Sequence, residues 1–586
     1  MGSIAVTHEP EVGERLPNGL LNQWHSQPRK LRIIHVGAGA TGLCTAFKME
    51  RQLTDYELVL YEKNDEIGGT WYENRYPGCA CDVPAHIYTY TFEPNPKWSS
   101  YYAYSPEIQD YFVGFAEKYN LRKYVKLKHK VLGAKWDEGK GEYEVKIQSG
   151  DKVITDWCNI LMNGSGLINK WRWPEIDGLH SFKGPLIHSA AWDESVDFKD
   201  KRVAILGTGS SAIQIVPEIQ KVATKLVCFM RNPTWIAPPM PRVQVDAALP
   251  DGDHPNKEAD NPDIKQYYYK PHEIQKFESD PEFLLNYRKK IEYAINQGFA
   301  IFYKDSEASK MAEKYMKNDM IRRLQNHPEL TKKLIPTWSV GCRRLNIDRR
   351  LTPGDGYLEA LIKSNVEPVY DEIIEITNDG LRTGDGSFHE VDIIVCATGF
   401  NMAWTPHFQL TGINGQDIKY SWSPNPNCYL GMAAPGFPNY FVINGPRGNL
   451  CNGTVLPCLE TEIEYVIKAA KKMQTDRIKA MDVSADITTK LNEYVDKWHT
   501  TGVWSSDCKS WYKNNTVDGK IMCWGGSSIH FLKCIKYPRW EHWNMSYLDD
   551  DPWGFLGNGK TEGETKGDYD MMTPYLRNSD VEWDIS

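Results

Sequence analysis

The sequence lacks the long apolar segment that a membrane-spanning helix requires. No stretch of its 586 residues approaches the roughly 18 consecutive apolar residues of such a helix. The N-terminal stretch MGSIAVTHEPEVGERL is polar and acidic and has no apolar core of a secretory signal. It begins with Met-Gly-Ser, but position 6 is Val6, which argues against myristoylation. We therefore expect no membrane span and a cytoplasmic location.

A long basic block is also missing. The 77 Asp and Glu residues outnumber the 68 Lys and Arg residues, and the formal net charge is −9. Proteins that bind nucleic acids need clustered positive charge to neutralise phosphates. The short Lys/Arg clusters present here are typical of solvated surfaces, so we expect no nucleic-acid partner.

The 13 cysteines contain no CxxC pair. Cys79 and Cys81 are separated by a single residue, and no second cysteine pair stands at metal-ligand spacing, so we expect no bound metal. The odd number of cysteines, and the position of Cys228 and Cys396 within apolar runs, favour reduced thiols in a reducing compartment.

The first chemical signal is a glycine-rich turn between two apolar strands at residues 31–62. Gly37, Gly39 and Gly42 follow the first strand, and Glu62 ends the second. In this motif the glycines permit a tight turn, the approach of a pyrophosphate and close helix packing, and a carboxylate accepts hydrogen bonds from a ribose hydroxyl. The pattern predicts a dinucleotide site. The alternative is a glycine-rich turn that binds nothing.

A divergent repeat of this unit lies at residues 202–231. Its turn reads Gly207-Thr208-Gly209-Ser210-Ser211, and its second strand ends in Arg231 where the first copy has Glu62. A guanidinium at this position can bind a ribose 2′-phosphate, whereas a carboxylate favours an unphosphorylated ribose. We therefore expect FAD at the first site and NADPH at the second. The alternative for Arg231 is an exposed arginine at the end of a strand.

An aromatic loop at residues 68–82 directly follows the first unit. Glycines and a Tyr-Pro-Gly turn interrupt regular structure here. Because the loop follows the ribose-binding acid, we expect it to cover the far end of the nucleotide, which in FAD is the isoalloxazine ring. The alternative is a purely structural aromatic loop. The residues that we assign to the site are Gly69, Thr70, Trp71, Tyr76 and Asp82.

The chain crosses from the first unit to the second through residues 182–192. This segment contains Phe182, Gly184, His188 and Trp192. A packed turn between domains is one interpretation of it, and a functional contact of His188 with the cofactor is the other.

Helical patterns fill much of the chain between residues 238 and 336. Asp280-Pro281 predicts a helix start, with Phe283, Tyr287, Ile291, Ala294 and Ile295 on one apolar face. Met311, Tyr315 and Leu324 suggest a second apolar face. These helices can form the wall of a pocket or can serve packing alone.

We expect an α/β protein with two Rossmann-like dinucleotide-binding domains, because 586 residues exceed a single core. Residues 1–30 form an N-terminal extension, and residues 31–178 the first part of an FAD-binding domain. Residues 179–384 form an NADP-binding domain with a helical insertion at 240–336. Residues 385–586 form the second part of the FAD-binding domain and a tryptophan-rich C-terminal cap. In that part, Thr398 and Gly399 follow an apolar strand, where the turn passes close to a ligand.

Two arginine pairs, Arg343-Arg344 and Arg349-Arg350, precede a Thr-Pro-Gly turn. Fixed arginines near a nucleotide either bind phosphate or stabilise a developing anion. The alternative is a solvated basic loop.

These motifs resemble those of type I Baeyer–Villiger monooxygenases, a family of class B flavoprotein monooxygenases, and most of all its fungal members. The most specific match is Phe182-x-Gly184-x-x-x-His188-x-x-x-Trp192, and a second is Gly68-Gly69-x-Trp71 followed by Tyr76-Pro77-Gly78 and Asp82. The resemblance extends from about residue 31 into the C-terminal region.

The resemblance implies roles for several residues. His188 links domain movement to NADPH binding, and Asp82 pairs with an active-site arginine that follows a second, phosphate-binding basic residue. The residues that precede the first arginine pair favour Arg344 as the active-site arginine, with Arg343 binding the phosphate. The spacing from the second pair to the Thr-Pro-Gly turn fits Arg350 in that role equally well. A departure from the family is Ala80, where many relatives carry arginine.

The resemblance also implies an activity. The enzyme would use FAD, NADPH and O₂ to insert one oxygen atom beside a ketone carbonyl, giving an ester or lactone through a flavin C4a-peroxide. We expect a lipophilic ketone as substrate and a monomeric enzyme. The alternatives are an N- or S-oxidising flavin monooxygenase, a disulfide-reductase-type flavoenzyme and a non-catalytic nucleotide-binding protein. The tryptophan of the linker motif argues against the first, and the spacing of Cys79 and Cys81 against the second.

Overall fold

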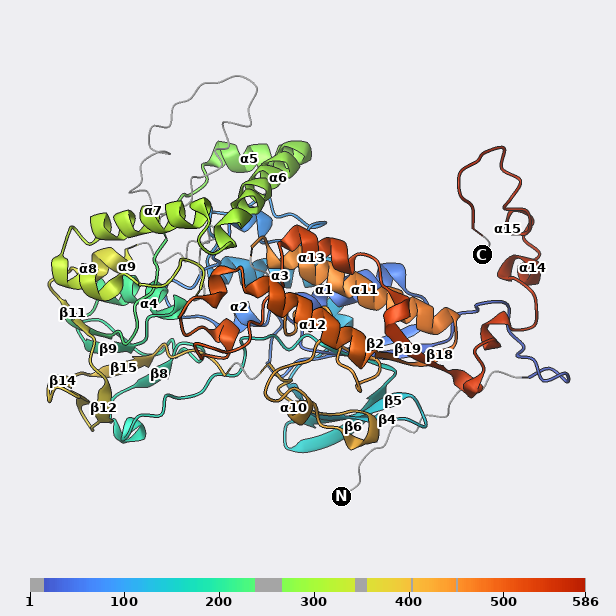
Figure 1. Ribbon diagram of the computed structural model, residues 1–586, viewed down its shortest axis with the longest axis horizontal. Coiled ribbons are helices and arrows are strands. Elements are labelled where there is room, and N and C mark those ends of the chain that lie inside the picture. The colour runs from blue at the N-terminus through green and yellow to red at the C-terminus, as the bar shows by residue number, and fades with distance from the viewer. Residues whose placement is uncertain (1–14, 238–265, 343–355, 402–403, 449–451, 585–586) are drawn as a thin grey trace.

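The structure is a computed structural model, which describes residues 15–237, 266–342, 356–401, 404–448 and 452–584 (Figure 1). The molecule is elongated. Helices α7 (Glu307–Arg323) and α8 (Pro328–Leu334) lie at one end of the long axis. The short C-terminal helices α14 (Glu562–Lys566) and α15 (Tyr569–Met572) project from the other end.

The first sheet has five parallel strands in the order β17-β7-β1-β2-β3. Helix α1 (Ala40–Gln52) carries the chain from β1 to β2 on one side of β1, and β7 lies on the other side. The strand order therefore reverses between β1 and β7, and such switch points are where open α/β sheets bind ligands. The strands are β17 (Tyr440–Val442), β7 (Ile160–Asn163), β1 (Leu31–Val36), β2 (Tyr56–Tyr61) and β3 (Val125–Lys126).

The second sheet repeats this arrangement with parallel strands in the order β11-β10-β9-β15-β8. Helix α4 (Ser210–Gln220) connects β9 to β10, and the order reverses between β9 and β15. The α/β architecture with two dinucleotide-type sheets is thus confirmed. The strands are β11 (Val366–Val369), β10 (Lys225–Phe229), β9 (Arg202–Leu206), β15 (Ile393–Cys396) and β8 (Leu186–His188).

Strand β15 differs from its sequence-based assignment. The sequence predicts a return to the FAD-binding domain at residue 385, but Ile393–Cys396 pairs with β9 and β8 in the second sheet. The chain returns to the first sheet only with β17. An apolar strand ending in a glycine turn fits either sheet, so the pairing partner, and not the local sequence, decided its place.

Three smaller antiparallel or mixed sheets flank the two parallel ones. Their strands are β16 (Gln409–Thr411), β4 (His129–Asp137), β5 (Glu142–Ser149) and β6 (Lys152–Cys158); β12 (Ile373–Ile376), β13 (Gly380–Thr383) and β14 (Phe388–Glu390); and β18 (Ile478–Val483) and β19 (Trp543–Tyr547).

Helices between β10 and β11 contact both cores. Helix α6 (Pro281–Gln297) begins as expected, because the Asp280 carboxylate accepts a hydrogen bond from the Phe283 amide at 2.9 Å. Its buried residues, including Tyr287 and Ile291, join the core of the first sheet together with α5 (Pro271–Ser279). Helices α7 and α8 instead join the core of the second sheet.

The prediction of the apolar face of α7 is wrong for two of its three residues. Met311 and Tyr315 are exposed, with relative accessibilities of 65% and 62%, whereas Leu324 is buried. Met316 and Met320 take the inward positions. The predicted and the observed apolar stripes of α7 are offset by one residue along the helix. Packing against the second core selected the stripe that contains Met316 and Met320.

One pair of cysteines departs from the expectation of reduced thiols. Cys342 and Cys508 form a disulfide with a Cα–Cα distance of 6.1 Å across 166 residues of sequence. It fastens the segment after α8 to the C-terminal region. The sequence spacing could not reveal this pair, because the two residues meet only through tertiary packing. The other described cysteines remain thiols, and all of them except Cys534 are buried.

The C-terminal region packs on both cores. Trp524 belongs to the core of the first sheet, as expected for a cap on that domain, whereas Trp504 stacks on Phe302 in the core of the second, with ring centroids 5.2 Å apart. This region contains α11 (Val455–Thr475), which packs against α1, and α12 (Ala485–His499) and α13 (Ser528–Ile535).

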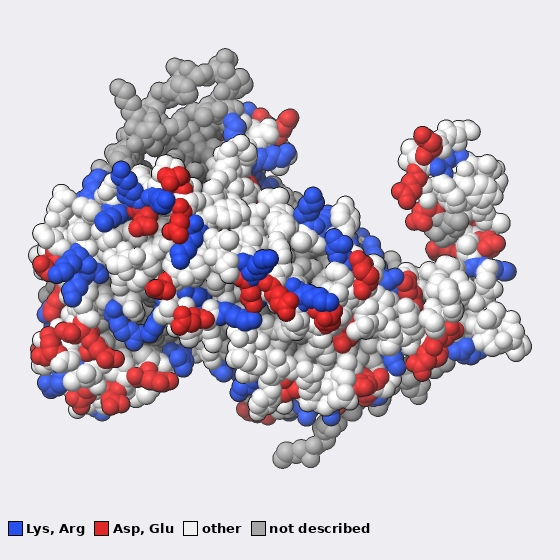
Figure 2. Space-filling model, viewed as in Figure 1, with Lys and Arg blue, Asp and Glu red and all other residues white. Residues whose placement is uncertain are grey.

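On the face shown in Figure 2, blue and red side chains are interspersed over most of the surface. Within the described ranges, no helix is both long and apolar enough to cross a membrane. The same residues contain no group of three or more His, Cys, Asp or Glu side chains placed to bind a metal ion.

His86 is a buried histidine in an aromatic cluster. Its ring lies among Tyr269, Phe277 and Tyr287, at centroid distances of 5.0, 4.4 and 5.4 Å. Neither ring nitrogen has a hydrogen-bond partner among the described residues. Burial, together with the nearby positive charge of Arg288, lowers the pKa of His86 to about 3.

This lowered pKa makes folding stability depend on pH. Between pH 6.5 and 3, His86 is protonated in the unfolded chain but stays neutral in the folded protein. We therefore expect the free energy of unfolding to fall as the pH drops from 6.5 toward 3. Urea unfolding at several pH values should show that His86→Phe takes up about one proton fewer on unfolding near pH 5. His272→Phe, which changes an exposed histidine on α5, is the control. Equal pH slopes in His86→Phe and the unsubstituted protein would contradict the assignment.

Candidate functional site

The first glycine turn lies at the switch point of the first sheet. Gly37 has a φ of +99°, and a Cβ there would lie 2.8 Å from the carbonyl oxygen of Gly164, which follows β7. Gly39 faces Gly69 across the turn, and a Cβ on Gly69 would approach the Gly39 Cα to 3.1 Å. These contacts require glycine because the backbones of three segments meet here. The first residues of α1, Ala40 and Thr41, line a common space with these glycines.

Glu62 closes the other side of this space. Its carboxylate accepts hydrogen bonds from the Ala38 amide at 2.8 Å and the Asn64 amide at 2.9 Å. The residue is 4% exposed, and burial raises its pKa. A carboxylate held against the turn in this way can accept further hydrogen bonds from ribose hydroxyls and would repel a 2′-phosphate. This buried acceptor therefore fits the ribose of FAD.

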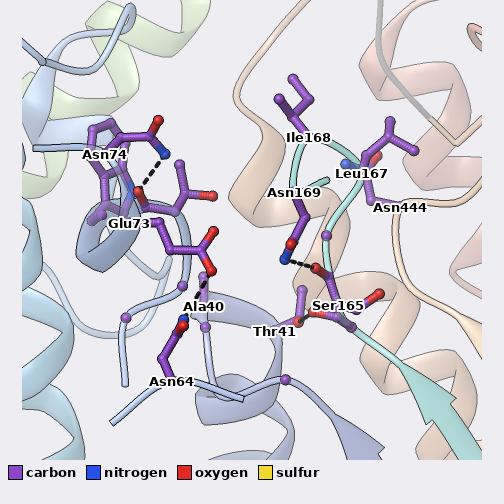
Figure 3. A pocket seen from close by; sticks show the side chains of 18 of the residues that line it. Ala40, Thr41, Asn64, Glu73, Asn74, Ser165, Leu167, Ile168, Asn169 and Asn444 are labelled. Carbon is purple, nitrogen blue, oxygen red and sulfur yellow. Dashed lines mark hydrogen bonds between the residues drawn. The ribbon is translucent and has the colours of Figure 1, made fainter. Parts of the chain in front are cut away.

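A cavity of about 410 Å³ connects these groups. Figure 3 shows two of its walls, one with Asn64, Glu73 and Asn74 and the other with residues 165–169 and Asn444. Hydrogen bonds fix both walls, from Asn64 to Glu73 at 2.9 Å and from Asn169 to the Ser165 carbonyl at 2.8 Å. Among the residues assigned from sequence, those lining the cavity are Gly37, Gly39, Glu62, Gly69, Thr70, Trp71, Tyr76, Asp82, Ser210 and Ser211.

The aromatic loop, which includes Glu73 and Asn74, also contributes Trp71 and Asp82 to the lining. Helix α2 (Thr70–Glu73) turns Trp71 toward Tyr88, whose hydroxyl accepts a hydrogen bond from Nε1 at 3.2 Å. Asp82 is half-buried in the lining, between the buried residues Cys81 and Val83. The loop also touches the second unit, because the Tyr76 hydroxyl donates to Gln214 at 2.9 Å.

The second glycine turn lies at the edge of the same cavity. Gly207 has a φ of +127°, and a Cβ there would lie 2.4 Å from the Ala397 carbonyl after β15. A Cβ on Gly209 would meet open space. Ser210 and Ser211, at the start of α4, line the cavity. An open turn at the start of an 11-residue helix fits a pyrophosphate.

Several assigned residues stand outside the cavity lining. Gly42 is buried within α1, and Thr208 donates a hydrogen bond to the Asn232 carbonyl at 2.9 Å. Arg231 is exposed after β10. Thr398 is exposed and Gly399 half-buried after β15, while the next residue, Phe400, lines the cavity. Arg343, Arg344, Arg349 and Arg350 lie outside the described residues.

His188 is 1% exposed and stacks on Trp171, with ring centroids 4.5 Å apart and planes 14° apart. Its Nδ1 accepts a hydrogen bond from the Ala190 amide at 3.1 Å, which assigns the ring proton to Nε2. Burial lowers its pKa to about 4, so the ring is neutral at pH 7. Trp192 stacks on Phe198, 5.3 Å away. In this arrangement His188 ends β8, the edge strand of the second sheet, and does not line the cavity.

Residues from distant parts of the chain also line the cavity, and the sequence alone did not indicate them. Gln214 stands only five residues after the second turn, but its side-chain partners are 134 and 138 residues away. The glycine turn after β7 was the signal for residues 164–169. No local pattern marked the others, which include His129, His407, Asn444, Leu456, Leu459 and Trp511.

Comparisons with known proteins agree with this geometry. A family described as flavin-binding monooxygenase-like matches residues 30–247. An FAD-binding monooxygenase of Aspergillus terreus is 37% identical over 554 residues, which cover 93% of this chain and 94% of the relative. A Baeyer-Villiger monooxygenase of Pseudomonas aeruginosa is 31% identical over 506 residues, covering 86% and 89%.

Solved structures share the fold. The crystal structure of cyclohexanone monooxygenase from Rhodococcus sp. Phi1 bound to NADP⁺ has a TM-score of 0.74 at 23% identity, with 89% of this chain and all of that chain covered. An oxidised steroid monooxygenase bound to NADP has a TM-score of 0.73 at 23% identity, with 89% of this chain covered.

Proposed function

The chain belongs to the flavin-binding monooxygenases of class B, and from this membership we propose that it is an FAD- and NADPH-dependent Baeyer–Villiger monooxygenase. It would insert one oxygen atom from O₂ beside the carbonyl of a ketone to give an ester or lactone. The alternative within the same class is oxidation of nitrogen or sulfur.

The observation that carries the proposal is the convergence of two nucleotide turns on one cavity. The first turn with Glu62, the aromatic loop with Asp82 and the start of α4 with Ser210 and Ser211 all line it. A flavin and a nicotinamide that exchange a hydride must meet in a single water-poor space. This arrangement supports a flavoenzyme that NADPH reduces.

Two further observations favour the Baeyer–Villiger reaction over oxidation of nitrogen or sulfur. The linker carries both His188 and Trp192 of the ketone-oxidising motif. A relative that is 31% identical over most of its length is a Baeyer-Villiger monooxygenase.

The chemistry supplied by bound FAD, once NADPH has reduced it, is the activation of O₂ for transfer of one oxygen atom. The residues of the chain would bind the cofactors and orient them. Glu62 would hold the ribose, and the amides beside Gly39 and Gly69 would hold the pyrophosphate. The apolar side chains of Phe400, Leu459 and Trp511 would exclude water from the reacting end of the cavity.

Asp82 would orient a basic side chain against the reacting atoms. A fixed guanidinium stabilises an anionic oxygen, and a carboxylate behind it keeps it in place. We propose Arg344 for this role, with Arg343 on the 2′-phosphate, and keep Arg350 as the competing candidate. Thr398 and Gly399 would approach the nucleotide from β15, and Arg231 would bind the 2′-phosphate. If Arg231→Ala leaves the ratio of the KM values for NADPH and NADH unchanged, that role is wrong.

The apolar part of the lining supports a lipophilic ketone as substrate. We also propose that the enzyme is a cytoplasmic monomer. Light scattering during gel filtration tests the oligomeric state.

The reaction is tested with ¹⁸O₂. The FAD-loaded protein, NADPH and a panel of cyclic and long-chain ketones should yield an ester or lactone that carries one labelled oxygen atom, with NADPH consumed in proportion. Mass spectrometry identifies the product. A matched panel of amines and thioethers serves as the comparison. Labelled N-oxides or sulfoxides without any ester would establish the alternative activity. Hydrogen peroxide as the sole product with every compound would exclude both.

A further inference from the structure

Gln214 makes the side-chain contacts that join the two nucleotide units beside the cavity. It lies on α4, one turn after the second glycine turn, and is 4% exposed. Its Nε2 donates to the Ala80 carbonyl at 3.1 Å, and its Oε1 accepts from the Tyr76 hydroxyl at 2.9 Å. Both ends of one amide are therefore satisfied by the aromatic loop of the other unit.

The backbone reinforces this contact. Gly78, between the two partners of Gln214, has a φ of +79°, and a Cβ there would lie 2.6 Å from the Gln214 carbonyl oxygen. Tyr76 and Cys79 are buried in the core of the second sheet, although they belong to the loop that follows the first. The loop is thus packed directly on α4.

The contact between Gln214 and the aromatic loop lies at the lining of the cavity. Gln214, Ser210, Ser211 and Asp82 all line the cavity. Only Cys81 separates Ala80 from Asp82, and one helical turn separates Gln214 from the start of α4. A shift of the loop relative to α4 would therefore change the distance between the flavin side and the nicotinamide side of the cavity. Reaction rates fall steeply when reacting groups move by about 1 Å.

We infer that Gln214 is a positioning residue that holds the aromatic loop in register with α4 and so sets the spacing of the two nucleotide sites. This inference rests on the proposed use of both nucleotides, but not on the identity of the oxidised substrate. The amide is specific: a carboxylate at this position keeps an acceptor for Tyr76 but cannot donate to the Ala80 carbonyl while it is ionised.

The test compares Gln214→Met, which keeps the volume and removes both hydrogen bonds, with Gln220→Met. Gln220 ends the same helix and donates to Asn365 at 3.0 Å, away from the cavity. Hydrogen–deuterium exchange of the FAD-loaded protein should show faster exchange of residues 76–82 in Gln214→Met alone, by about tenfold for two lost hydrogen bonds. Melting temperature and FAD content should match those of Gln220→Met.

Anaerobic reduction provides the second measurement. The rate constant for flavin reduction by NADPH should fall about tenfold in Gln214→Met, while the concentration of NADPH that gives half the maximal rate stays nearly constant. Gln214→Glu should behave likewise. Tyr76→Phe should show part of the effect, and adding it to Gln214→Met should cause no further loss from that hydrogen bond.

Unchanged exchange and reduction in folded Gln214→Met would overturn the inference. Equal changes in Gln220→Met would overturn it too, by showing a general effect on α4. If Gln214→Met does not fold, Tyr76→Phe and Gln214→Glu decide by the same measurements. Failure to oxidise ketones, with slowed reduction in Gln214→Met, would refute the proposed reaction and leave the positioning role intact.

Discussion

Asp82→Ala is expected to retain FAD but to insert oxygen into a ketone about a hundredfold more slowly, or worse. Asp82 lines the cavity, and its backbone is held by the buried neighbours Cys81 and Val83. The substitution removes a negative charge without opening the fold. The basic side chain that we propose beside it would then lose its fixed position, and with it the stabilisation of the anionic oxygen.

The measurement is the amount of ester or lactone formed per NADPH oxidised, together with the hydrogen peroxide released. Product should fall and peroxide should rise, because a reduced flavin that cannot transfer oxygen still reacts with O₂. Asp65→Ala is the control. Asp65 accepts a hydrogen bond from Tyr72 in the same stretch of chain, but it does not line the cavity. Full product yield in Asp82→Ala would refute the role of this carboxylate.

The same assay decides between the two arginine pairs. The arginine that pairs with Asp82 should, when changed to alanine, reproduce the loss seen in Asp82→Ala, and the double variant should lose little more. We expect this of Arg344→Ala. If Arg344→Ala keeps full ketone oxidation and Arg350→Ala does not, our preference is wrong and Arg350 is the arginine that pairs with Asp82.

Gly42→Ala is expected to weaken FAD binding strongly. A Cβ at this position would lie 2.3 Å from the Gly37 carbonyl oxygen and 3.2 Å from Leu60 Cδ2. The closer atom belongs to the backbone of the nucleotide turn, so relief of the clash must move the turn itself. Overpacking of this kind costs about 1–3 kcal/mol, and a loss of that size in the bound state weakens affinity roughly fivefold to more than a hundredfold.

The ratio of flavin absorbance to protein absorbance, and titration of the flavin-free protein with FAD, measure this effect. The control is Gly114→Ala in helix α3 (Ser105–Lys118), where a Cβ would meet nothing within 4 Å. That change should leave FAD binding intact and raise stability slightly, because alanine favours a helix by about 0.5–1 kcal/mol over glycine. Normal FAD content in Gly42→Ala would show that the turn can shift without cost to the site.

Residue types and their spacing were enough to predict the two nucleotide units and the aromatic loop. Gly37 and Gly207 adopt positive φ at the ends of β1 and β9, and Glu62 accepts backbone hydrogen bonds beside the first turn. Such requirements are local, because the conformation of a turn and the chemistry of a strand end depend on a few neighbouring residues. They were therefore readable from residue types and spacing, and so was membership of the family.

Which distant segments meet became visible only in the folded molecule. Tertiary packing placed β15 in the second sheet, joined Cys342 to Cys508 and brought Trp511 to the cavity. It also set the amide of Gln214 between Tyr76 and Ala80. Each of these pairings competes with many others of equal local quality, and the packing of whole cores selects among them. A turn can be read from its own residues, whereas a contact across more than a hundred residues depends on everything that folds between them.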